Sequence, residues 1–206
     1  MASFQAVNSE IILRAQLHAA LGVLGVLFEK ETLADVMNDE TLRPFVGRVI
    51  QNELMPALPE EGREQAVIAA CGYMSLKPVS EKCADCADGL IGEFALHILP
   101  KMNGETPLLT VCLAALIMLF AGVRKENGEY KIAGPDGQML TIKKDENALS
   151  SFSRLSVDMD ADSLVYAVLS DADIFGKDLR GADFEEKLLR DITDIQLAGL
   201  SEKIKK

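Results

Sequence analysis

Residues 108–120 read Leu-Leu-Thr-Val-Cys-Leu-Ala-Ala-Leu-Ile-Met-Leu-Phe, and they lie inside the 18-residue stretch 106–123, which has no charged side chain. This length is at the lower edge of the ~17–25 residues with which a helix crosses a membrane. Thr106, Pro107 and Thr110 weaken that interpretation, and the rest of the chain has the character of a soluble protein. The stretch therefore predicts a buried central helix, with a membrane span as the alternative.

The composition predicts a single folded domain over residues 1–206. Of the 206 residues 49% are hydrophobic, which excludes a disordered chain. The 32 acidic and 21 basic residues give a net charge of −11, which disfavours nucleic acid and anionic membrane surfaces as partners. Four cysteines do not make a disulfide scaffold, and the N-terminus lacks a signal-peptide pattern. We therefore expect a cytoplasmic protein.

Apolar residues recur at helical spacing over most of the chain. The first segment, 10–29, is nearly uncharged and has small residues between its leucines, which predicts a central helix in a bundle. Thr32 is expected to cap a short helix that ends near Met37, with Asp35 as its partner. Further helices are expected from Asp39 or Thr41 to Pro56, and over 59–74, 80–99, 146–155, 162–169 and 183–203.

A β-hairpin is expected near residues 129–143. Two short alternating runs, 130–132 and 139–142, flank the turn sequence Gly134-Pro-Asp-Gly137. An isolated hairpin is marginally stable in water, so it should pack on the helices. The expected fold class is therefore mostly α, a multi-helix domain with one small β-hairpin.

Motifs for cofactors and metals are weak in this chain. It has neither a Gly-x-Gly-x-x-Gly turn after a strand nor a Walker-A loop, so we predict no cofactor-binding residues. Cys83-Ala-Asp-Cys86 is a Cys-x-x-Cys, but it lacks a second ligand pair and the βαβ context of a redox motif. We predict no metal site and treat this pair as incidental, with a metal or redox role as the alternative.

Several segments, taken in order, resemble the C-terminal helical domain of the mannitol dehydrogenase family, and within it the sugar-acid reductases. The resemblance implies a fold like the C-terminal domain of 6-phosphogluconate dehydrogenase, and a substrate-side domain without the Rossmann domain. The segments are Leu17-His18-Ala-Ala-Leu-Gly-Val-Leu-Gly25, 31–39, 45–56, Lys77-Pro78, 98–100, Leu113-Ala-Ala-Leu-Ile117, 130–132, 168–169 and Ile174-Phe-Gly-Lys-Asp-Leu179.

The resemblance also implies site residues. The catalytic pattern of the family is similar to Lys-x4-Asn-x2-His; His18 matches the histidine, while Ala15 and Glu10 occupy the other two positions. His18 is therefore implied to bind substrate and to polarise its oxygen as a catalytic residue. Lys82, at the position of a second family histidine, is implied to attract a substrate carboxylate. At 100° per residue, positions 15 and 18 share one helix face and position 10 lies at its edge.

Two functions follow. In the first, the chain is the substrate-binding helical domain of a nicotinamide-dependent oxidoreductase acting on a sugar acid or polyol. It would bind no cofactor alone and would use NAD(H) only with a Rossmann-domain polypeptide, because hydride transfer needs a cofactor beside the substrate. In the second, which the changed positions 10, 15 and 82 favour, the chain is a catalytically degenerate homologue that serves as a binding or homo-oligomerisation module. An exposed apolar patch beside His18 would favour the first function, since a missing partner leaves it uncovered.

Overall fold

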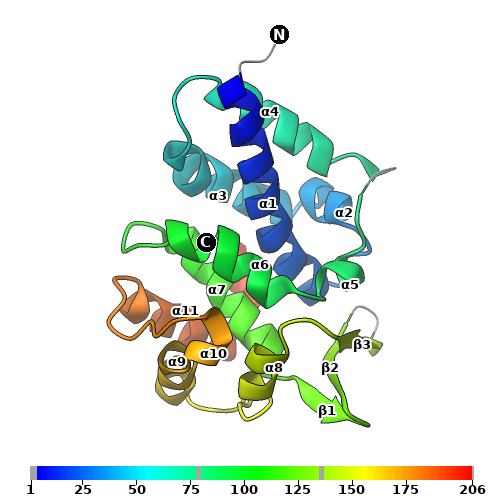
Figure 1. The fold of residues 1–206 in the computed structure, drawn as a ribbon, viewed down its shortest axis with the longest axis vertical. Helices are drawn as coiled ribbons and strands as arrows, with labels where there is room; N and C mark the ends of the chain where they lie inside the picture. Colours follow the sequence, from blue (N-terminus) through cyan, green and yellow to red (C-terminus); the bar gives the residue numbers. More distant parts are fainter. Residues whose placement is uncertain (1–3, 78–79, 135–136, 206) are drawn as a thin grey trace.

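The computed structural model describes residues 4–77, 80–134 and 137–205 (Figure 1). The described chain is mostly helical with one small antiparallel sheet, which confirms the predicted fold class. The helices are α1 (Phe4–Leu27), α2 (Leu33–Asn38), α3 (Leu42–Val49), α4 (Arg63–Met74), α5 (Cys83–Cys86), α6 (Leu90–His97), α7 (Pro107–Phe120), α8 (Glu146–Phe152), α9 (Ala161–Ser170), α10 (Ala172–Phe175), α11 (Glu185–Ala198) and α12 (Leu200–Lys205). Short π and 3-10 turns occupy Ile50–Leu54, Met55–Ala57 and Leu99–Lys101.

Helix α1 is the axis of one half of the molecule and packs against α2, α4, α5, α6 and α7, as the central helix was predicted to do (Figure 1). It begins at Phe4, earlier than the expected residue 10, because no helix breaker separates the two positions. Its length and composition would let it cross a membrane, but 61% of its most apolar window is buried inside the bundle. Gly25 lets α5 approach closely, since a Cβ there would collide with Cys83 Sγ.

Helix α7 is the buried central helix that the charge-free stretch predicted. Every residue from Leu109 to Ile117 is buried. The helix has 14 residues, which at about 1.5 Å per residue is shorter than the ~30 Å hydrocarbon core of a bilayer. The carboxylate of Glu53 accepts the N–H groups of Leu108 at 2.6 Å and of Leu109 at 2.7 Å, so it satisfies two donors at the start of the helix.

Several predicted helices were wrong in their bounds: those expected to reach Pro56 and residue 155 end as α-helices at Val49 and Phe152, and glycines explain three further cases. The helix expected over 59–74 begins at Arg63, because Gly62 has a left-handed φ of 75°. The helix expected over 80–99 is two helices, α5 and α6, separated by Gly89 at φ 98°. The helix expected over 183–203 is interrupted at Gly199, where φ is 84°. A left-handed residue cannot continue a right-handed helix.

The predicted caps around α2 and α3 are present. Thr32 and Asp35 form a reciprocal capping box at the start of α2. Asp39 accepts the N–H groups of Thr41 at 2.8 Å and Leu42 at 2.9 Å, which starts α3. These caps fix the chain that follows α1.

The predicted hairpin is confirmed as β2 (Glu129–Ala133) and β3 (Met139–Ile142), with Tyr130 opposite Ile142. Pro135 and Asp136 of its predicted turn lie outside the described residues, as does Pro78 of the predicted break at 77–78. A third strand, β1 (Arg124–Glu126), pairs with β2 and was not predicted, because its three residues are charged and exposed. Tyr130, Ile132 and Ile142 are buried.

Candidate functional site

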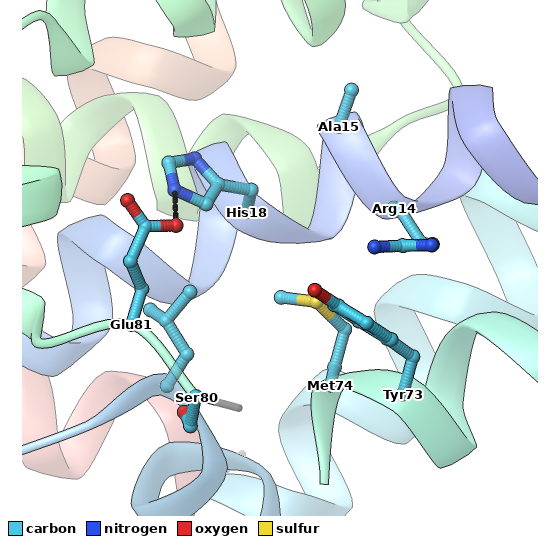
Figure 2. A pocket seen from close by; sticks show the side chains of 8 residues that line it. Arg14, Ala15, His18, Tyr73, Met74, Ser80 and Glu81 are labelled. Atoms are coloured by element: carbon cyan, nitrogen blue, oxygen red, sulfur yellow. Dashed lines mark hydrogen bonds and ion pairs between the residues drawn. The ribbon is translucent and has the colours of Figure 1, made fainter. Parts of the chain in front are cut away.

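A cavity of about 240 Å³ lies beside His18. Figure 2 shows the labelled side chains of its wall coming from α1, from α4 and from the segment that precedes α5. The lining residues are Arg14, Ala15, His18, Leu33, Tyr73, Met74, Ser80 and Glu81. Both charges and hydroxyl groups therefore meet at one small cavity.

One face of α1 supplies three of these residues. Ala15 and His18 both line the cavity, which confirms that these two positions share a helix face. Glu10 is outside the lining set, and its Oε1 lies 3.6 Å from Arg14 Nη1 one turn further along the helix. The helical period thus places Ala15 and His18 at the cavity and Glu10 outside its lining, as their spacing predicted.

Arg14 is a site residue that sequence reasoning missed. Its guanidinium carbon lies 3.4 Å from the centre of the Tyr73 ring, so a cation–π contact joins α1 to α4 (Figure 2). This contact holds a permanent positive charge in the cavity wall. The available signal was the rarity of charge on this helix: Arg14 stands four residues before His18 on the same face.

The segment before α5 is fixed against the start of α2. The Leu33 N–H donates to the Glu81 carbonyl at 3.0 Å, and the Ala34 N–H donates to Ser80 Oγ at 2.8 Å. A β-bridge pairs Thr32 with Lys82. These bonds place the Glu81 carboxylate against α1, where its Oε2 lies 3.0 Å from His18 Nε2.

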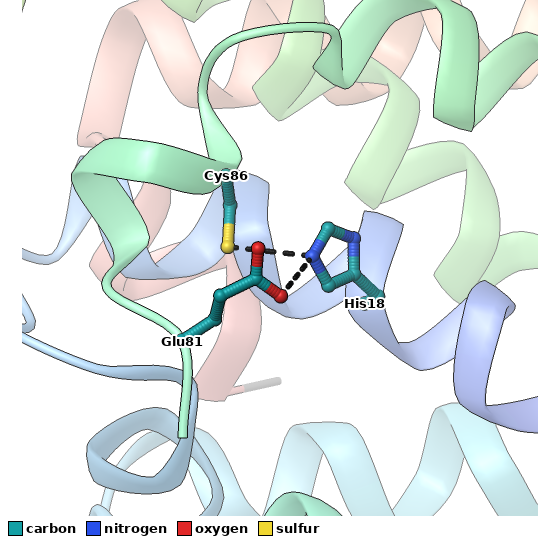
Figure 3. Close-up of side chains that lie close together, drawn as sticks. All are labelled: His18, Glu81 and Cys86. Atoms are coloured by element: carbon teal, nitrogen blue, oxygen red, sulfur yellow. Dashed lines mark hydrogen bonds and ion pairs between the residues drawn. The ribbon is translucent and has the colours of Figure 1, made fainter. Parts of the chain in front are cut away.

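A third group, Cys86, meets the same ring nitrogen (Figure 3). Its Sγ lies 3.5 Å from His18 Nε2 and the residue is buried. Burial raises the pKa of the Cys86 thiol, and the negative charge of Glu81 raises it further. Burial, followed by the charge of Asp35, also raises the pKa of Cys83 to about 12. Both cysteines are free, and neither is an activated thiolate.

The other predicted or possible site residues lie elsewhere. Lys82 is exposed at the position before α5 and is outside the set that lines the cavity. His97 is on α6, with Nε2 at 3.3 Å from Glu93. A wider hollow of about 690 Å³ is lined by four carboxylates, which would repel an anionic ligand: Asp162, Asp183, Glu185 and Glu186.

The fold of the chain is similar to part of a solved enzyme structure. No family model matches the chain. The described fold superposes with a TM-score of 0.76 on a Pseudomonas fluorescens mannitol 2-dehydrogenase, whose structure is a ternary complex with NAD and D-mannitol. The match is to the C-terminal region of that enzyme; it covers 100% of this chain and 41% of the enzyme at 18% identity. This likeness confirms the expected helical fold.

The sequence is similar to altronate oxidoreductases, which are also called tagaturonate reductases. The Enterobacter sp. strain 638 protein is 25% identical over 203 residues, covering 91% of this chain and 40% of that protein. A Yersinia pestis protein is 28% identical over 176 residues, and the match covers 79% of this chain and 34% of that protein. The resemblance to the mannitol dehydrogenase family is thus confirmed. The chain spans about 40% of the length of the Enterobacter relative.

Proposed function

We propose that this chain is the substrate-side helical domain of an NAD-dependent sugar-acid oxidoreductase, and that the cavity beside His18 binds a sugar acid or polyol. One observation carries the proposal: the histidine at the family's catalytic position lines a small cavity whose wall also contains a guanidinium. The named activity of the similar sequences, altronate oxidoreductase, supports this substrate class.

The cavity wall suits an anionic, hydroxyl-rich ligand. The guanidinium of Arg14 can pair with a carboxylate, which it recognises through two parallel hydrogen bonds. The hydroxyl groups of Tyr73 and Ser80 can donate to or accept from sugar hydroxyls, and the carboxylate of Glu81 can accept from them. A volume of about 240 Å³ is below the roughly 300–1,000 Å³ of sites for drug-sized ligands, so a small ligand fits best.

His18 would polarise the substrate oxygen, and Glu81 at 3.0 Å from Nε2 would orient its ring. Ala15 cannot form a hydrogen bond with a hydroxyl, and Glu10 replaces the lysine of the family pattern. The chain alone therefore would not transfer hydride; NAD(H) would be held by a Rossmann-domain polypeptide. Lys82 remains a candidate for attracting the substrate carboxylate from outside the cavity wall.

Exposed apolar residues beside the cavity support a covering partner. Six of the eleven large apolar side chains that are exposed in the described chain lie on α1, on α4 or directly after α4: Val7, Ile11, Ile12, Ile68, Tyr73 and Leu76. The same two helices supply most of the cavity wall. This distribution favours a Rossmann-domain polypeptide on this face, with a second copy of the chain as the alternative. A cytoplasmic location is part of the proposal, since the cysteines are free.

Calorimetric titration with altronate and tagaturonate tests the binding proposal. The protein is treated with a chelator, and wild type is compared with His18→Ala, Arg14→Gln and Lys82→Gln. We expect saturable binding by wild type. His18→Ala and Arg14→Gln should weaken this binding at least about tenfold, because each substitution removes a hydrogen-bonding group that contacts the ligand. His97→Ala is the matched control and should leave the affinity unchanged. Absence of binding by the wild-type chain, with or without a co-expressed Rossmann-domain polypeptide, contradicts the proposal.

The catalytically degenerate module is the second candidate, favoured by Ala15 and Glu10 at the two changed positions. NADH-dependent turnover of tagaturonate and fructuronate, with and without the Rossmann-domain polypeptide, separates the two candidates. Sedimentation analysis measures the assembly state of wild type and of Ile11→Glu. A wild-type dimer that the substitution dissociates, together with no turnover under any condition, favours the catalytically degenerate module.

A further inference from the structure

The three side chains His18, Glu81 and Cys86 converge on one point (Figure 3). Nitrogen, carboxylate oxygen and sulfur atoms of these residues all lie within 4.8 Å of one another. They come from two parts of the chain more than 60 residues apart, α1 and the segment 81–86. In the described part of the chain this is the group of three or more such donors that is close enough to hold a metal ion.

Two contacts of this group converge on one atom. Both Glu81 and Cys86 contact the same ring nitrogen, His18 Nε2. If that nitrogen carries a proton, it donates to the carboxylate and offers nothing to the thiol proton. If it carries a lone pair, it accepts from the thiol but faces a carboxylate oxygen at 3.0 Å. A cation between the three atoms would contact all of them at once.

Two of the three spacings between the donors are close to those of tetrahedral coordination. Zinc lies about 2.3 Å from a thiolate sulfur and about 2.0 Å from a histidine nitrogen or a carboxylate oxygen. At the tetrahedral angle, these lengths place sulfur and nitrogen about 3.5 Å apart, and nitrogen and oxygen about 3.3 Å apart. The distances in the protein are 3.5 Å from Cys86 Sγ to His18 Nε2 and 3.0 Å from His18 Nε2 to Glu81 Oε2.

We propose that His18 Nε2, the Glu81 carboxylate and Cys86 Sγ form a three-ligand site for a zinc ion. The sulfur donor selects zinc over magnesium and calcium, which prefer oxygen ligands only. Zinc displaces the thiol proton of Cys86 to solvent, so the ligand is a thiolate and no redox change occurs. Because His18 and Glu81 also line the cavity, the fourth position is available to water or to a cavity ligand.

This site differs from a Cys-x-x-Cys half-site, because it uses one cysteine of the motif. Cys83 lies against Gly25 of α1 and takes no part in the cluster. The two cysteines of this motif and the two histidines of the chain thus supply matched controls: Cys83 for Cys86, and His97 for His18.

The test measures binding of zinc and cobalt to the metal-free 206-residue chain. Cobalt(II) reports the ligands directly, since thiolate ligation gives an intense near-ultraviolet charge-transfer band and tetrahedral geometry gives strong visible bands. We expect one equivalent of either metal in wild type, Cys83→Ser and His97→Gln. Cys86→Ser should lose the charge-transfer band, and His18→Gln and Glu81→Gln should weaken zinc binding at least about tenfold.

Thermal unfolding keeps the test decisive if a buried variant folds poorly. Glu81 has a side chain that is 59% exposed, so Glu81→Gln should fold like wild type. Zinc should raise the melting temperature of wild type and raise it less in Glu81→Gln, because a ligand stabilises the state that it binds. Binding of less than one equivalent by wild type, or a charge-transfer band that survives Cys86→Ser or disappears with Cys83→Ser, overturns the proposal. None of these readouts depends on sugar-acid binding.

Discussion

The buried ionisable groups around α7, α11 and α12 contrast with those beside α1. Asp191 is 1% exposed, and its Oδ1 lies 2.8 Å from Lys203 Nζ. Glu53 receives two N–H groups of α7. Burial raises the pKa of both acids, but each charge has a partner that offsets the cost of its burial.

Beside α1, the same kinds of group are arranged differently. His18, Glu81 and Cys86 meet at one ring nitrogen at the edge of a cavity, and the Glu81 carboxylate is exposed, whereas Glu53 and Asp191 are buried. A buried acid that has a partner stabilises the fold, whereas the groups that converge at the cavity are those to which we assign ligand binding. Substitutions in the two regions should therefore affect different properties.

The largest expected loss of stability follows Lys203→Met. It leaves Asp191 buried without its partner, and breaking a buried pair costs about 3 kcal/mol of the free energy of unfolding. Urea unfolding measures the loss. Lys205→Met on the same helix is the control, since that lysine pairs with Glu202 on the surface and should change stability by less than about 0.5 kcal/mol. Equal effects of the two substitutions would contradict the structural role.

A loss of about 2 kcal/mol is expected for Glu53→Gln. The amide keeps the shape of the side chain but replaces one acceptor with a donor, so a buried N–H of α7 loses its partner. Urea unfolding at pH 7 gives the value, and Glu60→Gln, an exposed acid, is the control. If both variants unfold at the same urea concentration, Glu53 does not hold the start of α7.

Asp39→Ala should cost about 1 kcal/mol, because it removes the cap of α3. The Lys30 ammonium, whose Nζ lies 2.6 Å from Asp39 Oδ2, lowers the pKa of Asp39 below 3.8. The N–H groups of Leu42 and Thr41 lower this pKa further. A lowered folded-state pKa stabilises the fold fully above pH 3.8, and this contribution is lost as pH falls through the folded value. The difference in free energy of unfolding between wild type and Asp39→Ala should therefore shrink below pH 3.8, and a difference that stays constant as the pH falls would contradict this role of Asp39.

The smallest effect on stability is expected beside α1. Glu81→Gln should change the free energy of unfolding of the metal-free chain by less than about 0.5 kcal/mol, because the carboxylate is exposed and its backbone bonds remain. The same substitution should weaken ligand binding, as measured by the titrations above. A loss of stability as large as that of Glu53→Gln would erase the distinction between the two regions.

Local signals in the sequence were sufficient for much of the fold. The charge-free stretch 106–123 predicted α7, because a segment without charges must be buried. Thr32 and Asp35 predicted the cap of α2, and the alternating runs predicted β2 and β3. The helices split at Gly89 and Gly199 were missed, because a glycine can continue a helix or end it and only its φ decides.

The candidate site could be predicted only in part. The family pattern indicated His18, and the helical period placed Ala15 on the same face. The family pattern did not indicate Arg14, because the contact of the Arg14 guanidinium with Tyr73 joins two helices about 60 residues apart. Neither did it indicate Glu81 or Cys86 as neighbours of His18, since a β-bridge with Thr32 sets the position of that segment.

The sequence by itself determined most of the helical segments, the strands β2 and β3, and the burial of α7. These properties depend on the period of apolar residues and on caps within a few positions of one another. Only the tertiary structure decided that His18, Glu81 and Cys86 meet at one cavity. Distances between distant segments depend on how closely the helices pack, and no local pattern of residues specifies that.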